Sequence, residues 1–401
     1  MSPVRVVVAR GDPLERGRTV GWELADLIRG SLEFYWRYLV RRGVGAGELS
    51  GLLGPYLAAA ERELPDLVEL VTGMAEGSGV SFWELFCVNA FEELEPVLEA
   101  RTGRSLEPRE RCSTVTISGP GYTLLGHNEQ WLAGDVGHVA VVVELPDDGP
   151  ALVSPTLACC LPAVGMNEYR VAQGIQSLVA NDDGVGIPRV LVSRHALVAS
   201  SPADALRRAT LPGRAGGYGH SFAFGTGSAM HIETSATRFA VNGLPGGHTN
   251  HYLDPELAER APAPSPGSQA RLARLQELVT ERSPATPAAL GEILADHGGG
   301  GPQTICEHGR PEGSGRRGPG NPEGVPRSIK LRGGPPADRG IGWALLARMT
   351  SRGATRCSTP GRSGLAIRSS RRRAASAPMP ALSGLTEVRE ICRSSARKVS
   401  S

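Results

Sequence analysis

One cysteine, Cys112, stands where a charged connector meets a strand-like segment. The residues after it, STVTI, alternate and are β-branched, GPG at 119–121 is typical of a turn, and YTLLG predicts a returning strand. Residues 101–111 lack apolar periodicity, which predicts an exposed connector that could be cut. Cutting before Cys112 would free an α-amino group, whose ordinary pKa of about 7.7–8.0 suits a general base, so one residue would supply both nucleophile and base. The alternative is a small buried cysteine in a strand.

Short blocks elsewhere in the chain resemble, in order, the penicillin acyltransferase family of N-terminal nucleophile hydrolases, also called peptidase family C45. This family includes the fungal penicillin-forming acyltransferase and the carcinine hydrolases. The blocks are GDPLERG at 11–17, RCST at 111–114, GHNEQW at 126–131, GMNE at 165–168, SLVAND at 177–182, GIP at 186–188, HTNH at 248–251 and TIC at 304–306. No single block is specific, but their number and order are.

The resemblance implies a catalytic set around Cys112. It implies self-cleavage before this residue, a thioester acyl-enzyme, and transfer of the acyl group to water or to an amine. Asn250 matches the position whose amide stabilises the oxyanion, and Gln176 stands where relatives usually have asparagine. Gln130 stands where relatives carry an aspartate that holds the new ammonium group, so a charge is missing there, and the neighbouring Glu129 could replace it only if the strand were locally irregular. A turn-forming role for Asn250 remains open.

Three further residues are candidates for binding substrate. His127 and Asn128 lie beside the hairpin and could bind substrate or orient the amine, although a structural role is about as well supported. Arg194 matches a family arginine, and Glu233 ends a strand at a family glutamate. We expect an Arg194–Glu233 pair that bridges a helix and the sheet, with binding of a substrate carboxylate as the alternative.

Charge divides the chain into two parts. Residues 310–401 hold 19 Lys and Arg against 5 Asp and Glu, whereas the preceding 309 residues hold 24 against 36 and contain no lysine. The family resemblance stops at the same place, and the composition there is typical of a disordered basic tail. We hypothesise that this tail is read out of frame. The alternative to an enzyme is a catalytically impaired family remnant whose tail binds a polyanion, although the near absence of aromatic residues does not favour nucleic acid.

The seven cysteines show no paired spacing, which argues against disulfides and zinc and favours a cytoplasmic setting. We expect no cofactor and no metal, since His248 and His251 lie in a loop without a carboxylate partner. No stretch resembles a signal peptide or a membrane span. The expected partners are a small amide or acyl donor, with acyl-CoA as one candidate, and the two cleavage fragments, which should stay associated.

The elements expected around the site are helices followed by hairpins. An apolar stripe from Leu24 to Leu39 predicts a helix after Asp12-Pro13, a second helix covers 65–75, and Ser81 caps a third. Strands are expected at 138–145, 151–156, 220–224, 229–233 and 238–241, with helices at 188–198 and after Ser201. The predicted fold is α+β, and the resemblance implies a four-layer αββα sandwich. Its parts are a helical segment at 1–111, a catalytic part at 112–309 that lacks its last strands, and the tail at 310–401.

Overall fold

The computed structural model describes residues 4–103, 112–120, 122–131, 135, 137–242, 246–298, 305–306, 329–330 and 344–350. For residues 130–131, 329–330 and 344–350 it describes the backbone alone. All described residues lie within Met1–Thr350, which forms one compact unit. Residues 104–111 of the predicted connector and most of the predicted tail therefore lie outside the described residues, while Arg101 and Thr102, expected in the connector, end the helix Phe91–Thr102.

Helices make up most of the first hundred residues, as the sequence predicts. They are α1 (Pro13–Glu23), α2 (Ala25–Val40), α3 (Leu49–Glu63), α4 (Pro65–Ser78), α5 (Phe82–Asn89) and α6 (Phe91–Thr102), with a short 3-10 turn η1 (Ala46–Glu48). Asp12 caps α1 through a capping box in which Asp12 and Glu15 bond to each other's backbone N–H. The helix α3 was not predicted, because Pro55 and two glycines weaken its helical signal.

The larger sheet has eight strands in the order β1-β5-β6-β7-β8-β9-β10-β11. These strands are β1 (Arg5–Gly11), β5 (Val139–Pro146), β6 (Leu152–Leu157), β7 (Gly165–Asn167), β8 (Val171–Leu178), β9 (Gly217–Phe224), β10 (Ala229–Thr234) and β11 (Phe239–Asn242). Neighbours pair antiparallel except β1, which pairs parallel to β5. The predicted hairpins are therefore confirmed, and β1 is an edge strand that the sequence did not reveal.

The smaller sheet carries Cys112 at its open end. It consists of β2 (Ser113–Gly119), β3 (Tyr122–Asn128) and β13 (Ala344–Thr350), in the order β13-β3-β2, and all its pairs are antiparallel. Two further strands, β4 (Gln130–Trp131) and β12 (Ile329–Lys330), pair with each other. The strands β12 and β13 fall within 310–401, and the assignment of that stretch as a tail stays a prediction.

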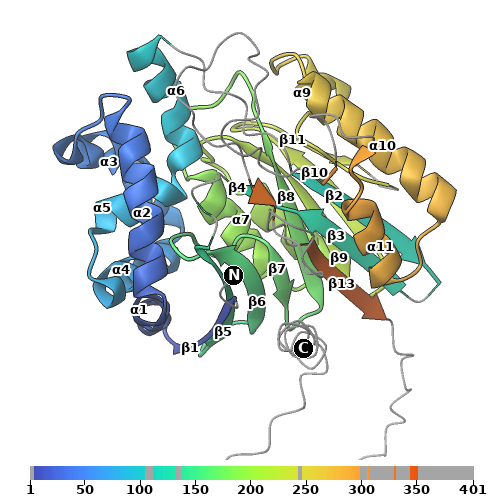
Figure 1. The fold of residues 1–401 in the computed structure, drawn as a ribbon, viewed down its shortest axis with the longest axis horizontal. Coiled ribbons are helices and arrows are strands. Elements are labelled where there is room, and N and C mark those ends of the chain that lie inside the picture. Colours follow the sequence, from blue (N-terminus) through green and yellow to red (C-terminus); the bar gives the residue numbers. More distant parts are fainter. Residues whose placement is uncertain are drawn as a thin grey trace, which may run out of the picture. The chain divides into compact units, whose positions relative to one another are not determined.

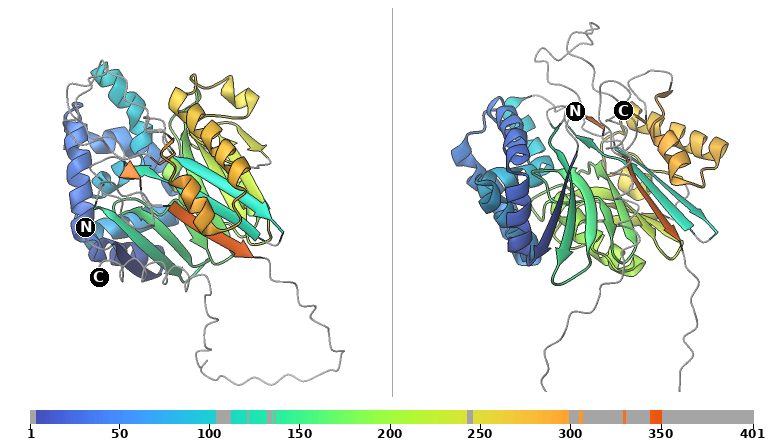
Figure 2. Two further views of the ribbon diagram at one scale, coloured as in Figure 1. Left: turned by 45° about the vertical axis from the view of Figure 1, so that its right-hand side comes forward. Right: turned by 60° about the horizontal axis from the view of Figure 1, so that its bottom comes forward.

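Helices cover the outer face of each sheet, which gives the expected α+β arrangement of four layers (Figures 1 and 2). On the large sheet, α7 (Arg189–Leu197) and α8 (Pro202–Ala209) pack against a cluster that includes Val171, Phe222 and Ile232. On the small sheet, α10 (Pro266–Arg282) and α11 (Pro287–Leu294) pack against Val115 and Leu124. The short helix α9 (Pro255–Ala258) precedes them.

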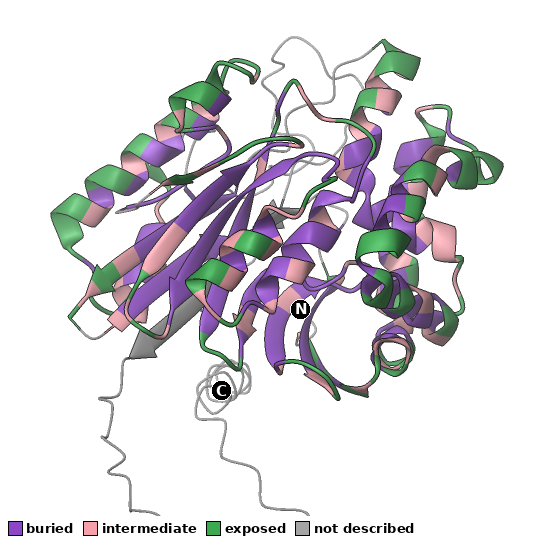
Figure 3. Ribbon diagram, turned by 180° about the vertical axis from the view of Figure 1, so that it is seen from behind, coloured by how far each residue is buried: buried purple, intermediate pink, exposed green. Residues whose placement is uncertain are grey.

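The two sheets meet through their inner faces. Leu125 of β3, Ala172 of β8 and Ala223 of β9 form a small apolar cluster there. Figure 3 shows that buried residues run along most of the strands of the large sheet, whereas the outer helices are buried on one side only. Because side chains alternate along a strand, the polar residues that share the inner face with this cluster are held between the sheets. The candidate site is built from those residues.

Arg194 does not pair with Glu233, and that expectation is wrong. Its Nη2 atom lies 2.7 Å from Oε2 of Glu144 in β5, and Nε of Arg16 in α1 lies 3.1 Å from the same oxygen. The side chain of Glu144 is 1% exposed. One buried carboxylate thus joins α1 and α7 to β5 of the large sheet, while Glu233 has a different partner. The sequence could not show this, since Glu144 reads as part of a valine-rich strand.

Replacing Glu144 by glutamine is expected to lower the free energy of unfolding by about 3–5 kcal/mol, because two buried guanidinium groups would lose their counter-charge. Urea unfolding followed by circular dichroism measures this change. The matched control is Asp26→Asn, which removes a carboxylate from the exposed Arg5–Asp26 pair and should cost less than about 1 kcal/mol. Equal effects of the two changes would contradict the importance of the buried cluster.

Candidate active site

Cys112 lies directly before β2 and is 7% exposed. Its Sγ atom is 3.5 Å from Oε1 of Glu129, a distance at which the thiol can donate a hydrogen bond involving sulfur. Its backbone carbonyl accepts a hydrogen bond of 2.8 Å from Nη1 of Arg271. The cysteine therefore has a carboxylate at its side chain and a guanidinium at its main chain, which is unlike the surroundings of a simple apolar core cysteine.

Glu129 faces Cys112 because strand alternation continues past the end of β3. His127 is two residues earlier and Thr114 is two residues after Cys112, and these two side chains bond across the hairpin, with 2.7 Å between His127 Nδ1 and Thr114 Oγ1. Nε2 of His127 lies 2.7 Å from Oε2 of Glu129. No irregular strand is needed to bring Glu129 to the thiol. The side chain of Gln130 lies outside the described residues, and its role stays a prediction.

Gln176 is fully buried between the sheets, and its amide nitrogen donates a hydrogen bond to Oγ1 of Thr114. The oxygen of the same amide is 3.5 Å from Oγ of Ser221 on β9. Gln176 thus contacts the strand of the proposed nucleophile through Thr114. Its catalytic role stays a prediction, and the contact that the structure shows orients Thr114 and, through it, His127.

Asn128 points to the outer face of the small sheet. Its Nδ2 atom donates to the backbone carbonyl groups of Leu294, at 2.9 Å, and Ile305, at 3.0 Å. These two hydrogen bonds join the end of α11 and Ile305 to β3. The structural role weighed for Asn128 in the sequence therefore has direct contacts. Substrate binding by His127, Asn128 and Arg194 stays a prediction.

Asn250 and Cys112 are joined by Arg271, which the sequence analysis missed. Nη2 of Arg271 donates to Oδ1 of Asn250 at 2.9 Å, and its Nη1 reaches Cys112 O as described above. Arg271 is 2% exposed and lies on the buried stripe of α10 with Leu275 and Leu278. A charged residue within an apolar stripe was the signal that could have revealed it.

The hydrogen bonds of its oxygen and nitrogen atoms fix the orientation of the Asn250 amide. Because Oδ1 accepts from Arg271, the Nδ2 atom points the other way and donates to the backbone carbonyl of Ser177 at 3.2 Å. An amide nitrogen carries two N–H donors, and Ser177 O is the one acceptor found for them among the described residues. The amide is therefore held in one orientation, and the role of Asn250 as an oxyanion donor stays a prediction.

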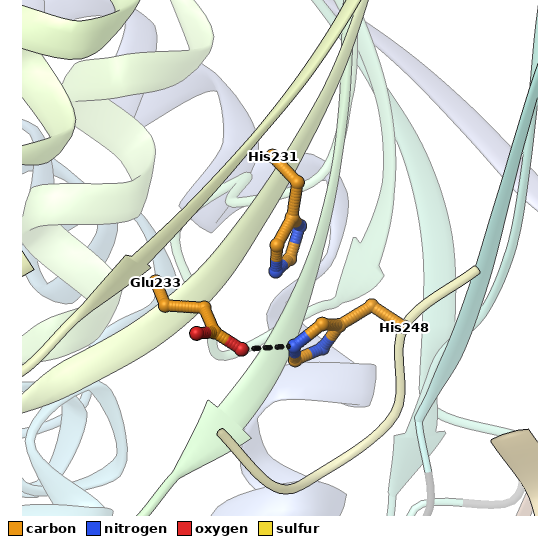
Figure 4. A group of neighbouring side chains, drawn as sticks. All are labelled: His231, Glu233 and His248. Carbon is orange, nitrogen blue, oxygen red and sulfur yellow. Dashed lines mark hydrogen bonds and ion pairs between the residues drawn. The ribbon is translucent and has the colours of Figure 1, made fainter. Parts of the chain in front are cut away.

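A group of two histidines and one glutamate lies on the inner face next to this site (Figure 4). The backbones of His248 and Thr114 form two hydrogen bonds with each other, each with a distance of 2.9 Å from nitrogen to oxygen. Nε2 of His248 is 2.7 Å from Oε1 of Glu233. Burial opposes ionisation of Glu233, but the bond from His248 and two backbone N–H groups outweigh it and lower the pKa of this carboxyl. His251, considered with His248 in the sequence, turns instead to Ser268, with 2.7 Å between Nδ1 and Oγ.

Replacing Arg271 by methionine is expected to lower kcat/KM by about 10²–10³-fold, because Asn250 would lose the charged group that fixes its amide. The rate is measured on protein whose folded state is confirmed by circular dichroism. Arg274→Met is the matched control, since Arg274 lies on the same helix and binds Asp296 and Glu277 at the surface. A loss that is the same in both variants would contradict a specific role for Arg271.

None of the helices among the described residues is long and apolar enough to span a membrane.

Comparison with known proteins supports the resemblance seen in the motifs. Residues 117–312 match the family model described as acyl-coenzyme A:6-aminopenicillanic acid acyl-transferase. A curated relative, the beta-alanyl-dopamine/carcinine hydrolase of Drosophila melanogaster, is 28% identical over 164 residues, which is 38% of this chain. The matched part spans 42% of that relative's length. Residues 117–312 are therefore similar to the acyl-coenzyme A:6-aminopenicillanic acid acyl-transferase family, which agrees with the family that the motifs resemble.

Proposed function

We propose that the protein is a cysteine-dependent N-terminal nucleophile enzyme that cleaves itself before Cys112 and then hydrolyses or transfers the acyl group of a small amide. The observation that carries this proposal is the arrangement around one residue: Cys112 Sγ lies 3.5 Å from a carboxylate, while Arg271 holds both the Cys112 carbonyl and Asn250. Similarity to the family model and to the curated relative supports an acyl-transferring or amide-hydrolysing chemistry.

Self-cleavage would begin with the thiol of Cys112. Glu129 takes the Sγ proton, and the thiolate attacks the carbonyl carbon of Arg111. A C–S bond forms and the C–N bond breaks, with the proton passing to the departing amine. Water then hydrolyses the thioester, which leaves a carboxylate on Arg111 and regenerates the thiol. The product fragment begins at Cys112 and carries a free α-amino group beside Sγ.

Turnover would use the same groups on a substrate amide. The α-amine of Cys112 removes the thiol proton, Sγ attacks the substrate carbonyl, and the second N–H of the Asn250 amide stabilises the oxyanion. Glu129 lies on the Cys112 side of the hairpin, so it can hold the ammonium form of the amine after the proton transfer. We assign to Glu129 the function that an aspartate would have at position 130. His127, bonded to Oε2 of Glu129 and to Thr114, fixes the orientation of the carboxylate.

The relatives suggest which substrates to test. One is named as a hydrolase of beta-alanyl-dopamine and carcinine, and the family description names an acyl-coenzyme A and 6-aminopenicillanic acid. For this chain we propose a small non-peptide amide as acyl donor, with acyl-CoA as the alternative donor, and water or an amine as acceptor. These choices differ only in the donor that acylates Cys112 and in the acceptor, water or an amine, that takes the acyl group from the thioester.

Intact-mass spectrometry after rapid acid quenching tests the proposal. The protein is mixed separately with beta-alanyl-dopamine, carcinine, and an acyl-CoA together with 6-aminopenicillanic acid. The expected result is a mass increase equal to the acyl group on the fragment that begins at Cys112, together with release of amine or free CoA. Turnover by Cys112→Ala, or an adduct on another cysteine, would contradict the proposal.

A further inference from the structure

His231, Glu233 and His248 bring three possible metal ligands to one point inside the protein. His231 and Glu233 lie two residues apart on β10, so their side chains share its inner face, and His248 comes from the following loop. One ligand atom from each residue lies within 4.8 Å of the other two. All three residues are 0% exposed. Figure 4 shows the two imidazole rings and the carboxylate turned toward one another.

His231 has a nitrogen that no hydrogen bond satisfies. Its Nδ1 is 2.9 Å from Oγ of Ser221, but its Nε2 has no hydrogen-bond partner among the described residues. A neutral imidazole that donates from Nδ1 carries a lone pair on Nε2, which is the form that binds metal ions. Leaving such a buried acceptor unpaired costs about 1–3 kcal/mol, so its presence calls for a ligand.

Glu233 is held by donors that leave its charge uncompensated by arginine or lysine among the described residues. The backbone N–H groups of Leu253 and Asp254 lie 2.6 and 2.9 Å from its two oxygens, and Nδ2 of Asn242 lies at 3.2 Å. Outer hydrogen bonds of this kind orient a carboxylate that binds a metal ion. Ser221 has the same relation to His231. The three ligand side chains are thus positioned by a second set of polar groups.

A simple ion pair between protonated His248 and Glu233 explains only part of this arrangement. In that account His231 Nε2 still has no hydrogen-bond partner among the described residues, although the His231 and His248 ring centroids are only 3.9 Å apart. A cation between the three residues uses the His231 lone pair and balances the carboxylate.

We propose that His231, Glu233 and His248 form a buried site for one divalent transition-metal ion, with Zn²⁺ as the best match. Two imidazoles and one carboxylate suit Zn²⁺ and its neighbours in the first transition row, whereas Ca²⁺ and Mg²⁺ prefer oxygen ligands. On binding, the metal replaces the proton between His248 Nε2 and Glu233 Oε1. This proton moves to Nδ1 of His248 or to solvent.

The position of the site gives it a structural consequence. His248 bonds through its backbone to Thr114, which is two residues after Cys112. A metal that joins His248 to β10 would therefore tie the strand of the nucleophile to the large sheet. Because folding forms the site, metal binding should stabilise the folded protein. This inference does not depend on self-cleavage or on any activity.

The test uses the full chain with its accessible thiols blocked by iodoacetamide, so that these cysteines cannot bind metal. The protein is treated with EDTA, loaded with Zn²⁺, dialysed, and analysed for bound metal and for thermal unfolding. The expected result is about one Zn²⁺ per chain and a melting temperature that rises with Zn²⁺ and falls again with EDTA. Loading with Co²⁺ should give visible absorption bands of a four-coordinate nitrogen and oxygen site.

Two variants and a control locate the site. His231→Gln and Glu233→Gln are expected to reduce bound metal at least about tenfold, since each removes one of three protein ligands. His195→Gln, which changes a histidine on α7 that lies beside Arg208, should bind as much metal as the wild type. Less than about 0.1 Zn²⁺ per folded wild-type chain, or binding by both ligand variants equal to that of the wild type, would overturn the proposal. The wild-type measurement decides the matter even if a variant fails to fold.

Discussion

Replacing Cys112 by alanine is expected to leave the protein as one uncut chain and to lower kcat/KM by about 10⁴-fold or more, because both the nucleophile and its α-amine base depend on this residue. Denaturing gel electrophoresis shows the uncut chain, and amine release from the amide substrates gives the rate. Iodoacetamide labelling near neutral pH adds a direct readout, because the Cys112 thiol, with Glu129 beside it to accept its proton, should react before the thiol of Cys87, which is 1% exposed.

Cys87→Ala is the matched control for this experiment. Cys87 lies on α5 and is 1% exposed, and burial raises the pKa of its thiol to about 12, so it should neither react nor take part in cleavage. We expect Cys87→Ala to be cut and active like the wild type. If Cys112→Ala is still cut, or if Cys87→Ala alone abolishes turnover, the assignment of the nucleophile is wrong.

Replacing Glu129 by glutamine is expected to slow self-cleavage and turnover by about 10²–10⁴-fold, the usual contribution of a positioned general base. The glutamine keeps the size of the side chain but can neither accept a proton nor hold the new ammonium group. Rates of fragment formation from freshly refolded chain, and the dependence of kcat/KM on pH, measure the two effects. The low-pH limb of the wild-type profile should be altered in the variant.

Two comparisons separate a chemical role of Glu129 from a structural one. Glu129→Asp keeps the charge and should recover part of the rate, whereas a merely structural role would make the shorter side chain at least as harmful as glutamine. Glu168→Gln changes a carboxylate that bonds to the backbone of Ala151 away from the site and should leave both rates unchanged. Wild-type rates in Glu129→Gln would show that another group supplies the base.

Local patterns in the sequence predicted many of the helices and strands, because a helix and a strand differ in the spacing of their apolar residues and end at recognisable caps and turns. The stripe through Ile28, Leu32 and Leu39 is buried on α2, and the hairpin predicted after Cys112 forms, with β2 antiparallel to β3. The split of the first helix at Leu24 and the parallel pairing of β1 with β5 were not predicted. Both depend on how distant segments pack, which a local pattern does not encode.

The sequence predicted the site residues that lie within a recognisable motif, but not the contacts between motifs. Cys112 and Asn250 were identified from their own blocks, and the structure shows that Arg271 joins them. That arginine lies on another helix, and its role emerges only when α10 packs against β2. Glu233 was paired with the wrong residue because sequence shows which face a strand residue takes but not what lies opposite it. The pair of His231 and Glu233 was overlooked since their third partner, His248, is a loop residue.

N-terminal sequencing of the purified wild-type chain tests the central claim most directly. The account predicts two polypeptides that remain associated in one folded particle, one beginning near Met1 and the other beginning Cys-Ser-Thr-Val, from cleavage between Arg111 and Cys112. Intact masses should equal those of the two fragments with one water added. A single polypeptide that begins only at Met1 or Ser2, in a preparation shown to be folded, would contradict it.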